Sequence, residues 1–390
     1  MKKIKTLLAS VALLSLIGCG SSSDEDSALV IPTYNTPTDT ACEDNLQDIE
    51  WAKLLSADAE KLSEYKLFQS QCNPTANPNT RGLPYDLSIP LFSDYTSKYR
   101  FIFVPENEKV DYVENEVFEF PVGSVISKTF SMPATTDERG YLVENVIETR
   151  LLIRKSTGWV ARAYVWDNDK LDATRTREGA SVPTVLGHGE DIIAFEYGVP
   201  TQSDCTECHK FKINDSETLF TPIGPKARYL NSNYEYSEGV LTNQIEKWVS
   251  EGLLDAATVP AAESREQAKT FNDYIDVDSI PPSEVEDFAK GWLDINCAHC
   301  HRTAGTASNT AFKASSVDAF QGYCEVPVSG AGTGALVILP GNAESSLVYQ
   351  RLNTTDAGFS MPPIGRSAIH KEGTALVARW INSLSAPTCN

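Results

Sequence analysis

The chain has 390 residues and a hydrophobic fraction of 41%, which suffices for two or three domains with their own cores. Its formal charge is −20, and a field of this sign repels nucleic acid and anionic lipid. We therefore expect no nucleic-acid partner. A solvated acidic surface is the simpler explanation of the charge, although it would also suit a basic redox protein.

The first residues predict export and lipid attachment. Residues 1–18 contain a lysine-rich start and an apolar run that is too short to span a bilayer. The string Leu16-Ile-Gly-Cys19 resembles a bacterial lipobox, which predicts cleavage before Cys19 and lipid on its thiol. An ordinary signal peptide that happens to contain a cysteine is the alternative. By the same resemblance, Gly20 favours the outer membrane, and residues 19–48 predict a tether rich in polar residues and proline.

The next part of the chain predicts β structure. Residues 49–82 indicate a short helical segment and then a loop, whereas residues 83–200 alternate apolar and polar positions. Strands are expected at 99–104, 117–122, 125–130, 143–155 and 159–166. Gly158 can supply the positive φ of a three-residue hairpin loop at 156–158. We expect a mostly antiparallel sheet or small sandwich, and we find no catalytic motif in it.

A Cys-x-x-Cys-His motif occurs at Cys205, Cys208 and His209. This is the attachment pattern of a c-type haem, in which both thiols form thioethers with the porphyrin and the histidine ligates the iron. A capping signature at 201–204 predicts the start of the helix that carries the motif. A later helical stripe is expected to cover a haem face and comprises Leu241, Ile245, Trp248, Val249 and Leu253.

The same motif recurs at Cys297, Cys300 and His301. Two such motifs in an exported chain predict two covalently bound haem c groups. The alternative is a zinc site built from two Cys-x-x-Cys pairs. The wide separation of the pairs in the sequence and the histidine after each pair favour haem.

The C-terminal part predicts helices around the second motif. An apolar stripe at Val285, Phe288, Ala289 and Trp292 predicts a helix that leads to Cys297. A further helix is expected at 343–352. A last stripe at 369–384 contains Gly373, which would allow two helices to approach closely.

Helices in this order resemble a class I cytochrome c domain. The resemblance implies that Met361, on the proline-containing loop 360–365, is the distal iron ligand opposite His301. A methionine that only fills a gap in the core is the alternative. Iron held by histidine and methionine has no open position, so it favours electron transfer.

Four of the nine cysteines remain after one lipid site and four haem-attachment sites are assigned. They are Cys42, Cys72, Cys324 and Cys389. In an oxidising compartment an even remainder predicts two disulfides, and three pairings are possible. We prefer Cys42–Cys72 and Cys324–Cys389, because each pair would then close one end of the chain. Unpaired buried thiols are the alternative.

The sequence leaves the sixth iron ligand of the first haem unassigned. Residues 210–296 contain no histidine and no methionine, so the segment after His209 cannot supply the usual ligand. The candidates from elsewhere are His188, Met132, His370 and Lys226. Lys226 would first have to lose its proton, His299 is expected to face solvent, and an open position is the remaining option.

Longer strings resemble an uncharacterised family of bacterial dihaem c-type cytochromes, which are often lipoproteins. These strings are 84–95, 120–130, 148–152, 221–228, 293–301 and 361–370. The resemblance covers most of the mature chain. It implies haem and an exported location, and it implies no substrate.

The predicted fold class is α+β. A mostly antiparallel β domain at 83–200 is expected to precede two small all-α, cytochrome c-like haem segments at 201–282 and 283–390. The predicted function is electron transfer with a redox protein partner at the bacterial cell envelope, from a lipid anchor in the membrane. The alternatives are a dihaem peroxidase-like enzyme whose first haem is open, and a redox-sensing lipoprotein whose β domain binds a partner.

Overall fold

The computed structural model describes Cys42, residues 44–76, 78–132, 145–188, 191–214, 216–328, 335–385 and Cys389. All of them belong to the unit Pro32–Asn390. The predicted signal peptide 1–18, the lipid site Cys19 and most of the tether lie outside the described residues. Within the described part, no helix combines the length and the apolar character needed to cross a bilayer.

The main sheet has six antiparallel strands, each paired with the next one in the sequence. They are β1 (Gly82–Pro84), β2 (Ser97–Phe103), β3 (Val125–Met132), β4 (Asn145–Lys155), β5 (Gly158–Trp166) and β6 (Ala173–Thr176). Lys155 pairs with Gly158, so the β4–β5 loop is one residue shorter than predicted, although Gly158 has the expected positive φ of 118°. The strand predicted at 117–122 is wrong, because that stretch forms only isolated bridges.

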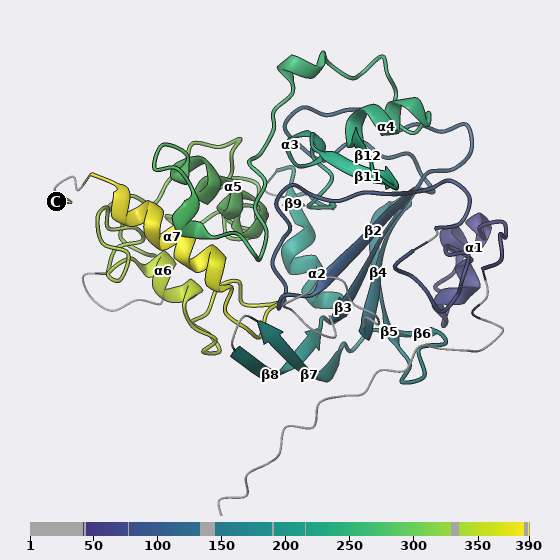
Figure 1. Ribbon diagram of the computed structural model, residues 1–390, viewed down its shortest axis with the longest axis horizontal. Helices are drawn as coiled ribbons and strands as arrows, with labels where there is room; N and C mark the ends of the chain where they lie inside the picture. Colours follow the sequence, from purple (N-terminus) through teal and green to yellow (C-terminus); the bar gives the residue numbers. More distant parts are fainter. Residues whose placement is uncertain are drawn as a thin grey trace, which may run out of the picture. The chain divides into compact units, whose positions relative to one another are not determined.

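One face of the sheet packs against the N-terminal segment. Alternate residues such as Phe101, Phe103 and Leu151 point to this face and share a core with Leu54 and Tyr65. These last two lie on α1 (Trp51–Ser56) and on the 3-10 helix η2 (Leu62–Tyr65). The helical segment predicted within 49–82 is therefore broken in two, and Figure 1 shows α1 and α2 (Gln202–His209) on opposite sides of the sheet.

The other face of the sheet carries the larger core. Ile102, Ile126 and Leu152 pair across β2, β3 and β4 and point to this side. The same core extends from Leu83 to Ile381, so it crosses the boundaries predicted at 200 and 282. The β region and the two motif-bearing segments therefore share one hydrophobic core.

Three further hairpins lie outside the main sheet. They are β7–β8 (Ala180–His188 and Asp191–Val199), β9–β10 (Lys210–Lys212 and Thr218–Phe220) and β11–β12 (Asn233–Ser237 and Val240–Asn243). The last two fall within 201–282, so the expectation of an all-α segment there is wrong. The architecture is nevertheless α+β with a mostly antiparallel sheet, as the sequence predicts at that level.

The helical stripe predicted from Leu241 to Leu253 is only partly helical. Leu241 lies on β12 and is 65% exposed, because the helix α4 (Gln244–Ser250) begins three residues later. Trp248 on α4 packs against the rings of Tyr85 and Phe118 at 5.7 and 6.1 Å. Trp248 does not line the cavity that contains the first motif, so its expected contact with a haem face stays a prediction. The remaining short helices before α5 are α3 (Ala227–Leu230), η3 (Ala262–Ser264) and η4 (Val277–Ser279).

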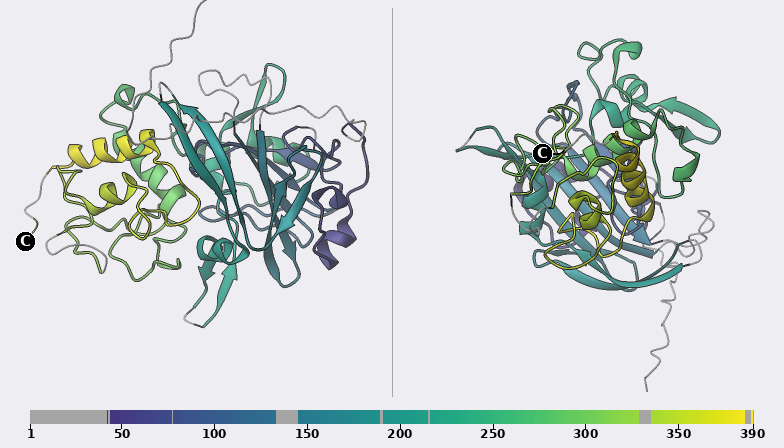
Figure 2. Two further views of the ribbon diagram at one scale, coloured as in Figure 1. Left: turned by 90° about the horizontal axis from the view of Figure 1, so that it is seen from below. Right: turned by 90° about the vertical axis from the view of Figure 1, so that its left-hand side faces the viewer.

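Three helices follow in the C-terminal part (Figure 2). They are α5 (Val285–Cys297), α6 (Leu347–Leu352), which is shorter than predicted, and α7 (Lys371–Ser383). Val285, Ala289 and Trp292 are buried on α5, as their spacing predicts. Helix α7 crosses α5 at Gly373, where an added Cβ would lie 2.5 Å from the Trp292 ring. The close approach predicted for Gly373 is therefore present.

The structure contains two disulfides, Cys42–Cys72 and Cys324–Cys389, with Cα–Cα distances of 5.1 and 5.2 Å. These are the two pairings that the sequence favours. The four motif cysteines remain free thiols.

The contact at Gly373 gives a first prediction. Gly373→Val is expected to lower the free energy of unfolding by about 1–3 kcal/mol, because the new side chain would enter the space of the Trp292 indole. Chemical denaturation of the variant and the wild type measures the loss. Gly198→Val is the control, since no atom lies within 4 Å of its Cβ position. Equal losses in both variants would contradict close α5–α7 packing.

Candidate cofactor site

Helix α2 positions the first motif. The Thr201 amide donates to Asp204 Oδ2 (2.9 Å), and the Asp204 amide donates to Thr201 Oγ1 (3.2 Å), which is the predicted capping box. Cys205 and Cys208 are three residues apart on this helix, so their thiols lie on the same side. His209 is its last residue.

The His209 imidazole is held in one tautomer. Its Nδ1–H donates to the Thr221 carbonyl (2.7 Å), and its ring stacks on Phe220 with centroids 4.8 Å apart. Burial lowers the pKa of His209 to about 4, so the ring is neutral at neutral pH. The Nε2 lone pair is then left for a metal. An anchored Nδ1–H of this kind is typical of metal-binding histidines.

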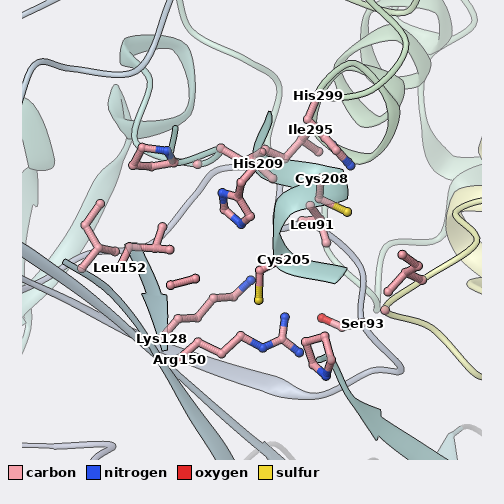
Figure 3. A pocket seen from close by; sticks show the side chains of 18 of the residues that line it. Leu91, Ser93, Lys128, Arg150, Leu152, Cys205, Cys208, His209, Ile295 and His299 are labelled. Atoms are coloured by element: carbon pink, nitrogen blue, oxygen red, sulfur yellow. The ribbon is translucent and has the colours of Figure 1, made fainter. Parts of the chain in front are cut away.

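Figure 3 shows Cys205, Cys208 and His209 around a cavity of about 170 Å³. Apolar side chains supply much of its lining: Leu87, Leu91, Ile126, Leu152, Ile223 and Ile295. The loop after Met361 also reaches the cavity, through Pro362 and Arg366 among others. The lining therefore combines residues from the sheet, from both motifs and from the predicted ligand loop.

Four basic residues of the sheet line this cavity, and one of them, Arg162 on β5, is paired with Asp58. Arg100, Lys128 and Arg150 pair with one another across β2, β3 and β4 and form one row. Arg100 contacts the Asp86 carboxylate, and Arg150 Nε donates to Glu148 Oε2 (2.9 Å). Lys128 has no carboxylate contact among the described residues, and its Nζ lies 4.6 Å from the centre of the Phe130 ring. Burial and the nearby Arg100 hold the pKa of Lys128 well below its usual value.

The second motif begins at the C-terminal end of α5. Cys297 is the last residue of the helix, and burial raises the pKa of its thiol to about 12. His301 Nδ1 lies 3.0 Å from Thr310 Oγ1, and burial lowers the pKa of its imidazole. His301, like His209, is thus a neutral ring with Nδ1 anchored.

A buried ion pair fixes α5 next to this motif. Arg228 Nη2 lies 2.7 Å from Asp294 Oδ2, and the Ser316 amide donates to Asp294 Oδ1 (2.9 Å). Tyr229 also donates to the same carboxylate. Asp294 is one helical turn before Cys297, so these contacts hold the end of α5 that carries the first cysteine of the second motif.

The two motifs meet although they are far apart in the sequence. Potential ligand atoms of Cys208, His299 and Cys300 lie within 4.8 Å of one another. The interaction between the Cys208 and Cys300 thiols lowers the pKa of Cys300 and raises that of Cys208. The prediction that His299 faces solvent is wrong, because its ring is partly buried and lines the cavity between the motifs. Sulfur and imidazole ligands also suit zinc.

Met361 lies beside this cavity without lining it. Its side chain is partly buried, and its amide donates to the Arg351 carbonyl (2.9 Å). Pro362 and Arg366 of the same loop line the cavity. The structure therefore places the loop near the motifs and leaves the role of Met361 as a prediction.

Two candidate sixth ligands of the first haem lie in a separate cluster. His188 Nε2 donates to Glu372 Oε1 (2.7 Å), and His370 Nδ1 accepts from Trp292 Nε1 (3.2 Å). His370 Nε2 lies 3.2 Å from Asp273 Oδ1. Burial alone would raise the pKa of Glu372, but the two histidines hold it below its usual value. Neither histidine lines the cavity of His209, so the structure does not bring them there.

The other two candidates also lie elsewhere. Met132 is fully buried at the end of β3, in a core cluster with Phe130 and Tyr197. Lys226 Nζ lies 3.6 Å from Glu116 and lines an adjoining cavity of about 210 Å³. Met132 is held by packing and Lys226 by its carboxylate partner.

Sequence reasoning missed the basic row and the carbonyl of Thr221. A signal for Lys128 was present, because it lies two residues from Ile126 and from Phe130 on a predicted strand. Period-two alternation places all three side chains on one face. The residue types opposite Lys128 depend on strand register, which the sequence leaves open.

Comparison of the chain with protein-family models, with curated proteins and with solved structures finds no match. Its function therefore has to be inferred from the two motifs and the cavity between them.

Proposed function

We propose that the chain is a dihaem c-type cytochrome that transfers electrons at the bacterial cell envelope. The observation that carries this proposal is the state of His209. Its ring is neutral, Nδ1 is anchored by the Thr221 carbonyl, and the cavity that it lines also contains the Cys205 and Cys208 thiols. These three residues are those that covalent haem attachment requires.

The chemistry of the cavity residues fits such a group. Cys205 and Cys208 would hold it covalently, and His209 Nε2 would bind its iron. The aliphatic lining suits a porphyrin body, and Arg100 Nη2 is buried in the cavity wall without a hydrogen-bond partner among the described residues. An anionic edge would satisfy that nitrogen. When bound, the group supplies one-electron transfer.

For the second site we propose a class I cytochrome c-like arrangement, with Cys297, Cys300 and His301 as attachment and proximal residues. The packing of α5 on α7 at Gly373 supports this proposal. Met361 would supply the second protein ligand of the iron. The proximity of Cys208 and Cys300 would bring the two groups close enough for rapid electron exchange.

The location belongs to the same proposal. We infer lipid attachment at Cys19 and an outer-membrane position from the lipobox resemblance. The acidic charge of −20 would suit a basic redox protein as the partner. Both disulfides are compatible with an oxidising compartment.

A potential titration of the purified holoprotein, followed by its visible spectrum, tests electron transfer. We expect two reversible one-electron transitions and rapid reduction and oxidation by small redox dyes. Failure of either centre to cycle reversibly would contradict the relay function.

Met361 gives a prediction for the second site. Met361→Ala is expected to leave both haems attached and to abolish the near-infrared charge-transfer band of methionine-bound ferric iron. The physical reason is that alanine cannot supply the thioether ligand. Met132→Ala serves as the control, since Met132 is buried in a core away from both motifs. A band that persists in Met361→Ala would show that another residue ligates the iron.

A second candidate function is reduction of peroxide at an open first haem. It is favoured by one observation: among the described residues, His188, His370 and Met132 all lie away from the cavity of His209. Rapid mixing of the half-reduced protein with peroxide separates the two functions. Turnover of peroxide supports the enzyme, whereas slow, unspecific oxidation supports the relay.

A further inference from the structure

We propose that Arg100, Lys128 and Arg150 form a binding site for a small anionic group inside the cavity of His209. The site deepens the proposed function and rests on it. Two sources share the required chemistry: a propionate carboxylate of the first haem, and a free anion that binds at the sixth position of its iron.

The strand register of the main sheet places the three basic residues in one row. Arg100 pairs with Lys128, and Lys128 pairs with Arg150, so the three side chains leave neighbouring strands on the same face. All three line the cavity. Like charges directly opposite one another destabilise a sheet. A row of three cations therefore requires anions nearby, and the structure shows where two of them come from.

The two arginines have carboxylate partners. Arg150 donates to both oxygens of Glu148, which is fully buried and also accepts from Tyr197. Arg100 contacts Asp86, whose side chain is 56% exposed, and its second terminal nitrogen, Nη2, keeps no partner although the side chain is only 3% exposed. Arg100 thus retains one buried donor on the cavity wall.

Lys128 is the cation without a carboxylate. No hydrogen-bond acceptor contacts its Nζ among the described residues, and the nearest aromatic face is Phe130. In Figure 3 the side chain extends from the sheet into the cavity, below His209. The Lys128 side chain is only partly buried, but an ammonium group that leaves water without an anionic partner is still costly. An anion in the cavity would satisfy both Lys128 Nζ and the free nitrogen of Arg100.

The row next to the cations is apolar. Ile102, Ile126 and Leu152 pair across the same three strands, two residues along each strand from the basic row. Residues two apart on a strand are separated by roughly 6–7 Å. One face of the sheet thus offers an aliphatic surface beside a cationic one. This suits a flat, largely apolar ligand with an anionic edge, or such a ligand with a small anion beside it.

The experiment compares Lys128→Leu with Lys98→Leu in the full chain with both haems attached. Leucine cannot ligate iron. Lys98 lies on β2 and donates to the Thr96 carbonyl without lining the cavity, so it controls for the loss of one lysine from the sheet. Lys128→Gln replaces the leucine variant if the latter does not accumulate. Haem content is measured first, and sodium azide is the probe anion.

Two results support the site and distinguish its sources. If a free anion is bound, azide changes the ferric spectrum of the wild type. Lys128→Leu then lowers the affinity for azide by about tenfold or more, whereas Lys98→Leu leaves it unchanged. If a propionate is bound, azide does not change the ferric spectrum of the wild type or of either variant. The midpoint potential of one haem then falls in Lys128→Leu alone, because a cation that favours the reduced iron is lost.

Two results overturn the site while the proposed function stands. One is equal azide binding and equal potentials in both variants. The other is a change of the first haem from low spin to high spin in Lys128→Leu, which would make Lys128 an iron ligand. A haem-free wild type would overturn the proposed function, and this inference with it.

Discussion

Replacement of Cys205 and Cys208 by serine is expected to halve the haem content, from two haems per chain to one. Serine cannot form a thioether, so the first motif would lose its covalent attachment while Cys297 and Cys300 keep theirs. The pyridine haemochrome absorbance per polypeptide measures the loss.

The matched control is the double variant Cys42→Ser and Cys72→Ser. It also removes two sulfur atoms, but they form a disulfide rather than a motif. We expect it to retain both haems and to lose only stability. An unchanged haem content in the Cys205 and Cys208 variant would show that the first motif holds no haem.

The second large effect is expected from Asp294→Asn, which should lower the free energy of unfolding by about 3–5 kcal/mol. The side chains of Arg228 and Asp294 are 5% and 2% exposed, so the variant would leave a buried guanidinium without its charge partner. Chemical denaturation at neutral pH measures the loss. Asp287→Asn on the exposed side of α5 is the control and should cost less than about 1 kcal/mol.

The effect of Asp294 should depend on pH. Burial alone would raise the pKa of this carboxyl, but Arg228 and Lys226 outweigh burial and hold it below its usual value. A carboxyl with a depressed pKa stabilises the fold above its unfolded pKa of about 4, and the contribution is lost as the pH falls further. The stabilities of wild type and Asp294→Asn should therefore converge in acid. A constant difference down to low pH would contradict the ion pair.

Local features of the fold could be predicted because short-range rules determine them. The Thr201–Asp204 capping box and the turn at Gly158 each involve residues that are close in the sequence. Gly373 within an apolar stripe predicted a close helix contact, and the structure supplies its partner, Trp292. The boundaries of such elements were less accurate, as the start of α4 after Leu241 shows.

The candidate site could be predicted only in part, because tertiary contacts assemble it. Each Cys-x-x-Cys-His motif is evident in the sequence, but the approach of Cys208 to Cys300 depends on how α2 and α5 pack. The cationic row needs the register of three strands. The sequence offers His188 and His370 as ligands, whereas carboxylates far away in the sequence contact both of them.

The most direct test of haem binding is the intact mass of the chain after export in a host that attaches c-type haem, combined with peptide mapping. We predict two haems, one on the peptide with Cys205 and Cys208 and one on the peptide with Cys297 and Cys300. Elemental analysis of the same sample should find iron. Four unmodified motif thiols, with bound zinc and no porphyrin absorption, would contradict the account and assign Cys208, His299 and Cys300 to a zinc site instead.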